Sequence, residues 1–60
     1  MSAHVKVGQV WMDKSTGREW TVKAPEIDGD GWWMESERRT DKIVPEPIVF
    51  ADYVLVKDAP

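Results

Sequence analysis

The chain has 60 residues, with 11 acidic and 8 basic side chains, a formal charge of −3 and no cysteine. This composition excludes disulfide bridges and thiolate metal sites, and it argues against a nonspecific phosphate-backbone binder, which is usually strongly basic. Hydrophobic residues make up 42% of the chain, as in a folded protein, and no stretch approaches the roughly 20 apolar residues of a membrane span. We expect one soluble, cytoplasmic domain over residues 1–60, with an ordered core at about 7–57.

The N-terminal part of the chain predicts a β-hairpin. A first strand is expected over 7–13, followed by a tight loop that Gly17 closes in the left-handed conformation as a G1 bulge. The second strand, 18–24, alternates polar and apolar residues and directs Trp20, with Val22 and Ala24, toward the core. Pro25 should end this strand, because proline cannot donate a hydrogen bond to a ladder.

Two adjacent tryptophans begin the third predicted strand, 32–37, which follows a polar, glycine-rich connection. Successive side chains of a strand point to opposite faces of its sheet, so one of the two rings points away from the core. Trp32 shares its face with Met34 and is expected to point inward. Trp33 shares its face with Glu35 and Glu37, and is therefore predicted to point outward.

The C-terminal part predicts two more strands. Residues 38–39 form the tip of a hairpin, and the fourth strand, 40–44, should bury Ile43. The segment 48–52 follows two prolines and suits a single 3₁₀ turn, because it is too short for a stable helix. The last strand, 53–57, is apolar on both faces, as is typical of a strand that closes a barrel.

Three segments carry a resemblance to known proteins: Gly-Gln-Val-Trp at 8–11, Ile-Val-Pro at 43–45 and Phe-Ala-Asp-Tyr-Val-Leu-Val at 50–56. With the predicted order of elements, the chain resembles the SH3-like small barrels, which include the SH3, Tudor and KOW domains. The resemblance implies an all-β, five-stranded barrel with one 3₁₀ turn before the last strand. The chain also resembles short uncharacterised proteins of bacteriophages and prophages.

The chain departs from the signature of each of these families. It lacks the Ala-Leu-Tyr-type opening and acidic first loop of peptide-binding SH3 domains, and it lacks the basic, glycine-centred stretch of a KOW element. A Tudor domain holds methylated Lys or Arg in an aromatic cage, for which Trp33, Trp11 and Tyr53 could supply rings if they converge. Fold-level analogy alone does not transfer a function.

The connection before the third strand comes close to a calcium-binding loop. Asp28, Asp30, Gly31 and Glu37 match the spacing of the EF-hand pattern, with Glu26 at its first position. An EF-hand needs a helix on each side, whereas a proline and a strand flank this loop. We expect a solvated hairpin loop and no metal or cofactor.

Catalysis is not expected from this chain. It has no cysteine, and its single histidine, His4, lies in a predicted tail. A 60-residue barrel also leaves little room for a cleft that could hold a nucleophile and a base. We predict a protein that is not an enzyme.

Two binding hypotheses remain. In the favoured one the chain is a protein-interaction module, including a phage- or prophage-type protein that binds or inhibits a host protein, with Trp33 as anchor and Arg38, Arg39 and Glu35 orienting the partner. In the alternative, Arg38, Arg39 and Lys42 join Trp33 in a nucleic-acid-binding surface. Trp33 could instead be covered by the segment 45–47 and contribute only to stability. The chain is expected to be a monomer or a weak homodimer, with no membrane contact.

Overall fold

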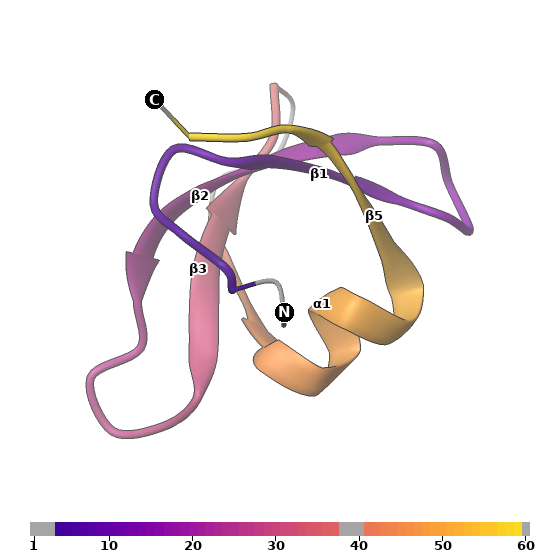
Figure 1. Cartoon of the computed structure of the whole chain (residues 1–60). Helices are drawn as coiled ribbons and strands as arrows, with labels where there is room; N and C mark the ends of the chain where they lie inside the picture. Colours follow the sequence, from indigo (N-terminus) through magenta and orange to yellow (C-terminus); the bar gives the residue numbers. More distant parts are fainter. Residues whose placement is uncertain (1–3, 38–40, 60) are drawn as a thin grey trace.

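The computed structural model describes residues 4–37 and 41–59. One mixed-length antiparallel sheet and one short helix account for its regular structure: β1 (Val10–Asp13), β2 (Glu19–Pro25), β3 (Gly31–Glu35), β4 (Lys42–Pro45), α1 (Glu46–Asp52) and β5 (Tyr53–Lys57). The strand order is β4-β3-β2-β1-β5, so β4 and β5 are the two edges, and α1 connects them (Figure 1). The mostly β prediction is confirmed. In the part of the chain described, no ladder joins β4 to β5, and the sheet is not closed.

The loop between β1 and β2 is ordered by Asp13 and Gly17. The Gly17 N–H donates to the Asp13 carbonyl oxygen at 2.7 Å, and the Asp13 N–H donates to the Arg18 carbonyl oxygen at 2.8 Å. Gly17 has a φ of +75°, which confirms the predicted left-handed conformation. The Asp13 carboxylate accepts hydrogen bonds from the Ser15 N–H at 2.9 Å and the Ser15 hydroxyl at 2.7 Å, an Asx-type turn.

A register shift in β2 changes which of its side chains face the core. Trp20 and Val22 are buried, as predicted, and Pro25 is the last residue of the strand. The pairing with β3 is shifted between Val22 and Ala24, so that Ala24 lies opposite Trp33 and is only half-buried. The extra residue moves Ala24 off the core face, contrary to simple alternation.

The prediction that Ile43 is buried is wrong. Ile43 is 40% exposed, whereas its neighbour Val44 is 5% exposed. In the β3–β4 ladder Val44 pairs with Trp32 and Ile43 pairs with Trp33. Since paired residues share a face, Val44 takes the core side with Trp32, and Ile43 takes the opposite side.

The segment before β5 is an α-helix of seven residues, Glu46–Asp52, and not the predicted 3₁₀ turn. Proline in the first turn fixes a helical φ at no cost in hydrogen bonds, and Glu46 places a negative charge at the N-terminal end. The helix ends where the N–H of Tyr53 donates to the Val49 carbonyl oxygen. Val49 is completely buried, so tertiary packing stabilises a helix that would not persist alone.

Residues 4–9, which the sequence places in a tail and the start of a strand, belong to the packed structure. Val5 is buried in the core. Gly8, with a φ of +98°, donates its N–H to the Val22 carbonyl oxygen at 2.9 Å, and the Val22 N–H donates to the Gln9 carbonyl oxygen at 2.9 Å. The core side chains are Val5, Trp11, Trp20, Val22, Met34, Val44, Val49 and Tyr53.

Gln9 is a buried amide whose four hydrogen bonds connect both ends of the described chain. Its Oε1 accepts from the Lys6 N–H at 2.8 Å and from Trp11 Nε1 at 3.0 Å. Its Nε2 donates to the Asp58 carboxylate at 2.8 Å and to the His4 carbonyl oxygen at 3.3 Å. The amide is fully satisfied, as a buried polar group must be to avoid a large desolvation cost.

Candidate protein-interaction site

The two adjacent tryptophans lie on opposite faces of β3. Trp32 packs against the core cluster, which confirms its inward orientation. Trp33 is half-buried and lies between Ala24 of β2 and Ile43 of β4 on the other face of the sheet. The neighbouring side chains cover part of the Trp33 ring and leave part accessible.

Glu35, the second predicted contact residue on β3, borders a groove separate from Trp33. The groove has a volume of about 700 Å³, and Val10, Thr21 and Glu35 form part of its lining. Glu19, Glu35 and Glu37 bring three carboxylates to it, against one guanidinium, that of Arg18. This excess of negative charge repels phosphate groups.

Two further predicted contact residues, Arg38 and Arg39, lie outside the described residues. Their predicted roles in orienting a protein partner or contacting nucleic acid therefore stay predictions. Lys42, the third cation of the predicted nucleic-acid surface, is among the described residues. It lies on the face of the sheet opposite Trp33.

Trp11 and Tyr53 lie in the core and not on the surface. Both are at most 6% exposed. The Trp11 indole N–H is bonded to Gln9, and its ring meets that of Phe50 edge to face, with 5.9 Å between ring centroids. The structure therefore brings Trp11 and Tyr53 together in the interior and separates them from Trp33, so these three rings do not form a surface cage.

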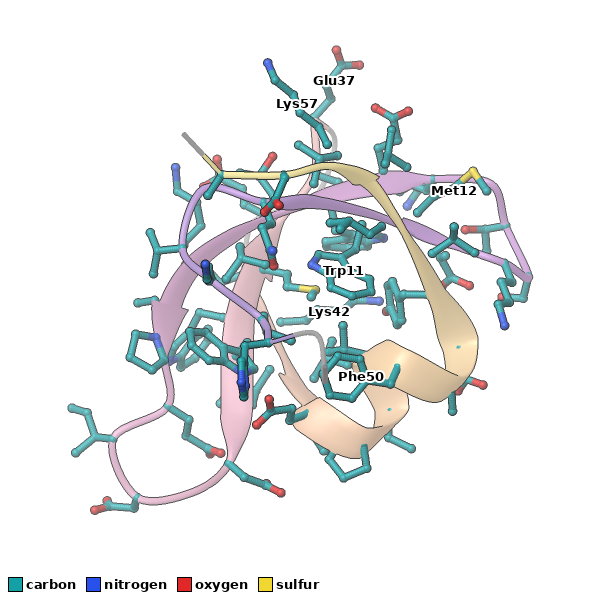
Figure 2. The ribbon with its side chains drawn as sticks, viewed as in Figure 1. Trp11, Met12, Glu37, Lys42, Phe50 and Lys57 are labelled. Carbon is teal, nitrogen blue, oxygen red and sulfur yellow. The ribbon has the colours of Figure 1, made fainter. Side chains whose placement is uncertain are left out.

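Lys42 points its ammonium into the interior rather than into a basic surface patch. Its Nζ is 4.0 Å from the centroid of the Trp20 ring and 5.3 Å from that of Tyr53 (Figure 2). Cation–π attraction to two rings favours this position of the charge. The buried Nε1 of Trp20 has no acceptor among the described residues.

A group of exposed apolar side chains on α1 and β5 involves residues that the sequence does not mark as contact residues. We call it the α1–β5 surface and define it by five side chains that are between 37% and 49% exposed: Ile48, Phe50, Val54, Leu55 and Val56. Of the residues of α1 and β5, only Val49 and Tyr53 are buried. The sequence predicts a 3₁₀ turn over 48–52 and a barrel-closing strand over 53–57, and it does not mark these residues as a contact surface.

The exposed side chains of β5 lie on both sides of the sheet. Leu55 pairs with Trp11, whose ring points inward toward Phe50, whereas Val54 pairs with Met12 on the outside (Figure 2). Val56 has no partner in β1, because the register shifts by one residue there. Since β5 is an edge strand, its apolar residues surround an unpaired edge.

The described residues show no arrangement suited to a metal ion. No group of three or more His, Cys, Asp or Glu side chains within residues 4–37 and 41–59 is placed to hold one. In the calcium-like loop, the Glu26 carboxylate accepts a hydrogen bond from the Gly31 N–H at 3.3 Å, and the Glu26 N–H donates to the Gly31 carbonyl oxygen at 2.8 Å. Glu26 thus closes the β2–β3 hairpin.

The chain was compared with family models, with curated proteins and with solved structures, and none of them matches it. Among the helices of the described residues, none has the length and apolar character that crossing a membrane requires.

Proposed function

We propose that the chain is a non-enzymatic protein-interaction module whose contact area is the α1–β5 surface. The observation that carries this proposal is the exposure of five large apolar side chains around an unpaired strand edge. Scattered exposed apolar residues are ordinary, but apolar side chains on both sides of an unpaired strand edge favour association.

Phe50 supports the proposal as a preorganised anchor. It is 43% exposed, yet its ring is held edge to face against the buried Trp11. A ring that is already fixed loses little conformational entropy when a partner covers it. Aromatic anchors of this kind dominate the binding energy of many interfaces.

Trp33, the anchor predicted from the sequence, remains part of the proposal as a second contact. It is half-buried beside Ile43, which is 40% exposed, on the opposite face of the sheet. Trp33 can contribute one exposed ring surface, whereas the α1–β5 surface offers several neighbouring side chains and a strand edge. We therefore assign it the smaller share of binding.

The SH3-like architecture is also kept as a proposal. The order β4-β3-β2-β1-β5, with a short helix before the last strand, is compatible with it. A role as a phage- or prophage-type inhibitor of a host protein rests on the sequence resemblance alone.

A charge substitution on β5 tests the proposed function. We expect Val54→Lys to weaken capture of a partner protein by at least about tenfold, because it places an ammonium group in an apolar contact. Capture from cell lysate, followed by titration of the retained protein, measures the effect. Trp33→Ala, tested in parallel, should weaken binding less.

Ile27→Lys is the matched control, because Ile27 is 95% exposed in the loop between β2 and β3, away from this surface. It should bind as the unmodified chain does. Equal thermal midpoints would show that Val54→Lys is folded. Retention of the same partner by all variants at equal affinity would contradict the proposal, and loss on Trp33→Ala alone would move the site to Trp33.

A further inference from the structure

We propose that the occupant of the α1–β5 surface is a second copy of this chain, with the two β5 strands paired antiparallel about a twofold axis at Leu55. This inference rests on the proposed function and names the partner. Two features of β5 carry it: the direction of its free backbone groups and the pattern of its side chains.

The backbone of Leu55 is available at the open edge. The N–H of Lys14 donates to the Asp52 carbonyl oxygen at 3.0 Å, which continues the β1–β5 ladder beyond the Asp13–Tyr53 pair. Bonded and non-bonded pairs alternate in an antiparallel ladder, so the N–H and C=O of Leu55 point away from β1. The N–H of Tyr53 is already taken by Val49, which makes Leu55 the centre of the free edge.

A twofold axis perpendicular to a pair of antiparallel strands passes midway between one residue and its own copy in the second strand. Leu55 meets the requirement for a hydrogen-bonded centre, because both of its backbone groups face the open edge. In that register Val54 lies opposite Val56 of the second copy, and two Leu55 side chains meet on the Trp11 side. The palindromic sequence Val-Leu-Val is self-complementary in this arrangement.

Pairing at the edge also explains why apolar side chains are exposed on both sides of β5. A partner lying on one face would cover Leu55 and Phe50, or else Val54, but not both groups. A strand added at the edge extends both faces at once and covers them together.

A charge at the symmetry centre tests the twofold arrangement. In sedimentation equilibrium from about 10 μM to about 1 mM, we expect the chain to form a dimer at the upper concentrations. Leu55→Lys should raise Kd at least about tenfold, because like charges that lie directly opposite each other across paired strands repel. Equal thermal midpoints would show that this variant is folded.

The matched control is Ile27→Lys, which adds the same charge at a position that is 95% exposed in the loop between β2 and β3. It should dimerise as the unmodified chain does. A monomer throughout the concentration range, or a dimer that Leu55→Lys leaves unchanged, would overturn the inference. If the chain is monomeric but Val54→Lys still weakens capture of a partner protein, the dimer is excluded and the proposed function stands. If the chain is monomeric and Val54→Lys does not weaken capture, the proposed function fails as well.

Discussion

Among single residues, the four tryptophans differ in how completely the fold covers them. Trp11 and Trp20 are each 4% exposed, whereas Trp32 and Trp33 are half-buried. Trp20 fills the middle of the core face and also supports the ammonium group of Lys42. The energetic consequences of removing these rings should therefore differ.

We expect Trp20→Ala to lower the free energy of unfolding by about 3–5 kcal/mol, because it opens a cavity in the core and removes a cation–π contact. Trp33→Ala should cost about 1–2 kcal/mol, since the ring is only partly covered. Urea unfolding followed by circular dichroism gives both values. Equal losses for the two variants would show that Trp33 is as structural as Trp20.

Alternation along the sequence placed Trp20, Trp32 and Met34 correctly, because the extra residue at the register shift lies in β2 after Val22, so alternation is intact at Trp20 and throughout β3. It failed for Ile43, since a four-residue strand of mixed character does not reveal which of two neighbouring residues faces inward. It also could not reveal Lys42 over Trp20, because that contact depends on residues distant in sequence that only the folded sheet brings together.

At the scale of elements, the β1–β2 hairpin combines a glycine that relieves backbone strain with an acidic side chain that orders the loop. Gly17 takes up the positive φ, and Asp13 accepts two hydrogen bonds from Ser15. Hydrogen bonds from the Ser15 hydroxyl and then its backbone N–H hold the pKa of Asp13 below its ordinary value of 3.8. The loop was readable from sequence because its chemistry is local.

The lowered pKa gives hairpin stability a definite pH dependence. The pKa of Asp13 in the folded protein lies below the unfolded value of 3.8. The ionised carboxylate therefore contributes fully to stability above pH 3.8, and this contribution is lost as the pH falls through the folded pKa. We expect Asp13→Asn to reduce the acid dependence of the thermal midpoint below about pH 4. The same slope in both proteins would show that Asp13 does not carry this dependence.

The helix and last strand were less predictable than the hairpin. A short sequence that begins with two prolines and lacks amphipathic periodicity does not distinguish a 3₁₀ turn from an α-helix. The α-helical outcome depends on the burial of Val49, a tertiary contact. Likewise, the apolar residues of β5 fit a buried strand or an interface strand equally well, and only the strand order reveals that β5 is an edge.

At the scale of the whole molecule, Gln9 links the segment before β1 to the segment after β5. Its amide is 3% exposed and bonds to Lys6, Trp11, His4 and Asp58. The hydrogen bond from Gln9 holds the pKa of Asp58 below its ordinary value of 3.8. A side chain predicted to be an ordinary strand residue is thus a connection between distant parts of the fold.

Replacing Gln9 with leucine should destabilise the protein by about 2–3 kcal/mol, because the indole N–H of Trp11 loses its acceptor in a buried position. Amide hydrogen exchange should also show faster exchange for residues of β1 and β5 than for those of β3. Gln9→Glu is the informative comparison, since it keeps an acceptor for Trp11 but loses the donor to Asp58. An unchanged free energy of unfolding for Gln9→Leu would refute this role.

The contact between Gln9 and Asp58 joins residues 49 positions apart and has a kinetic consequence. β5 is last in the sequence but pairs with β1, which is first, so nearly the whole chain must be drawn together before this ladder can form. The entropy of closing such a long loop slows folding, and it places β1–β5 pairing after the local hairpins. During synthesis β1 is made well before β5, so the edge of β1 that β5 covers stays unpaired until the last strand has been made.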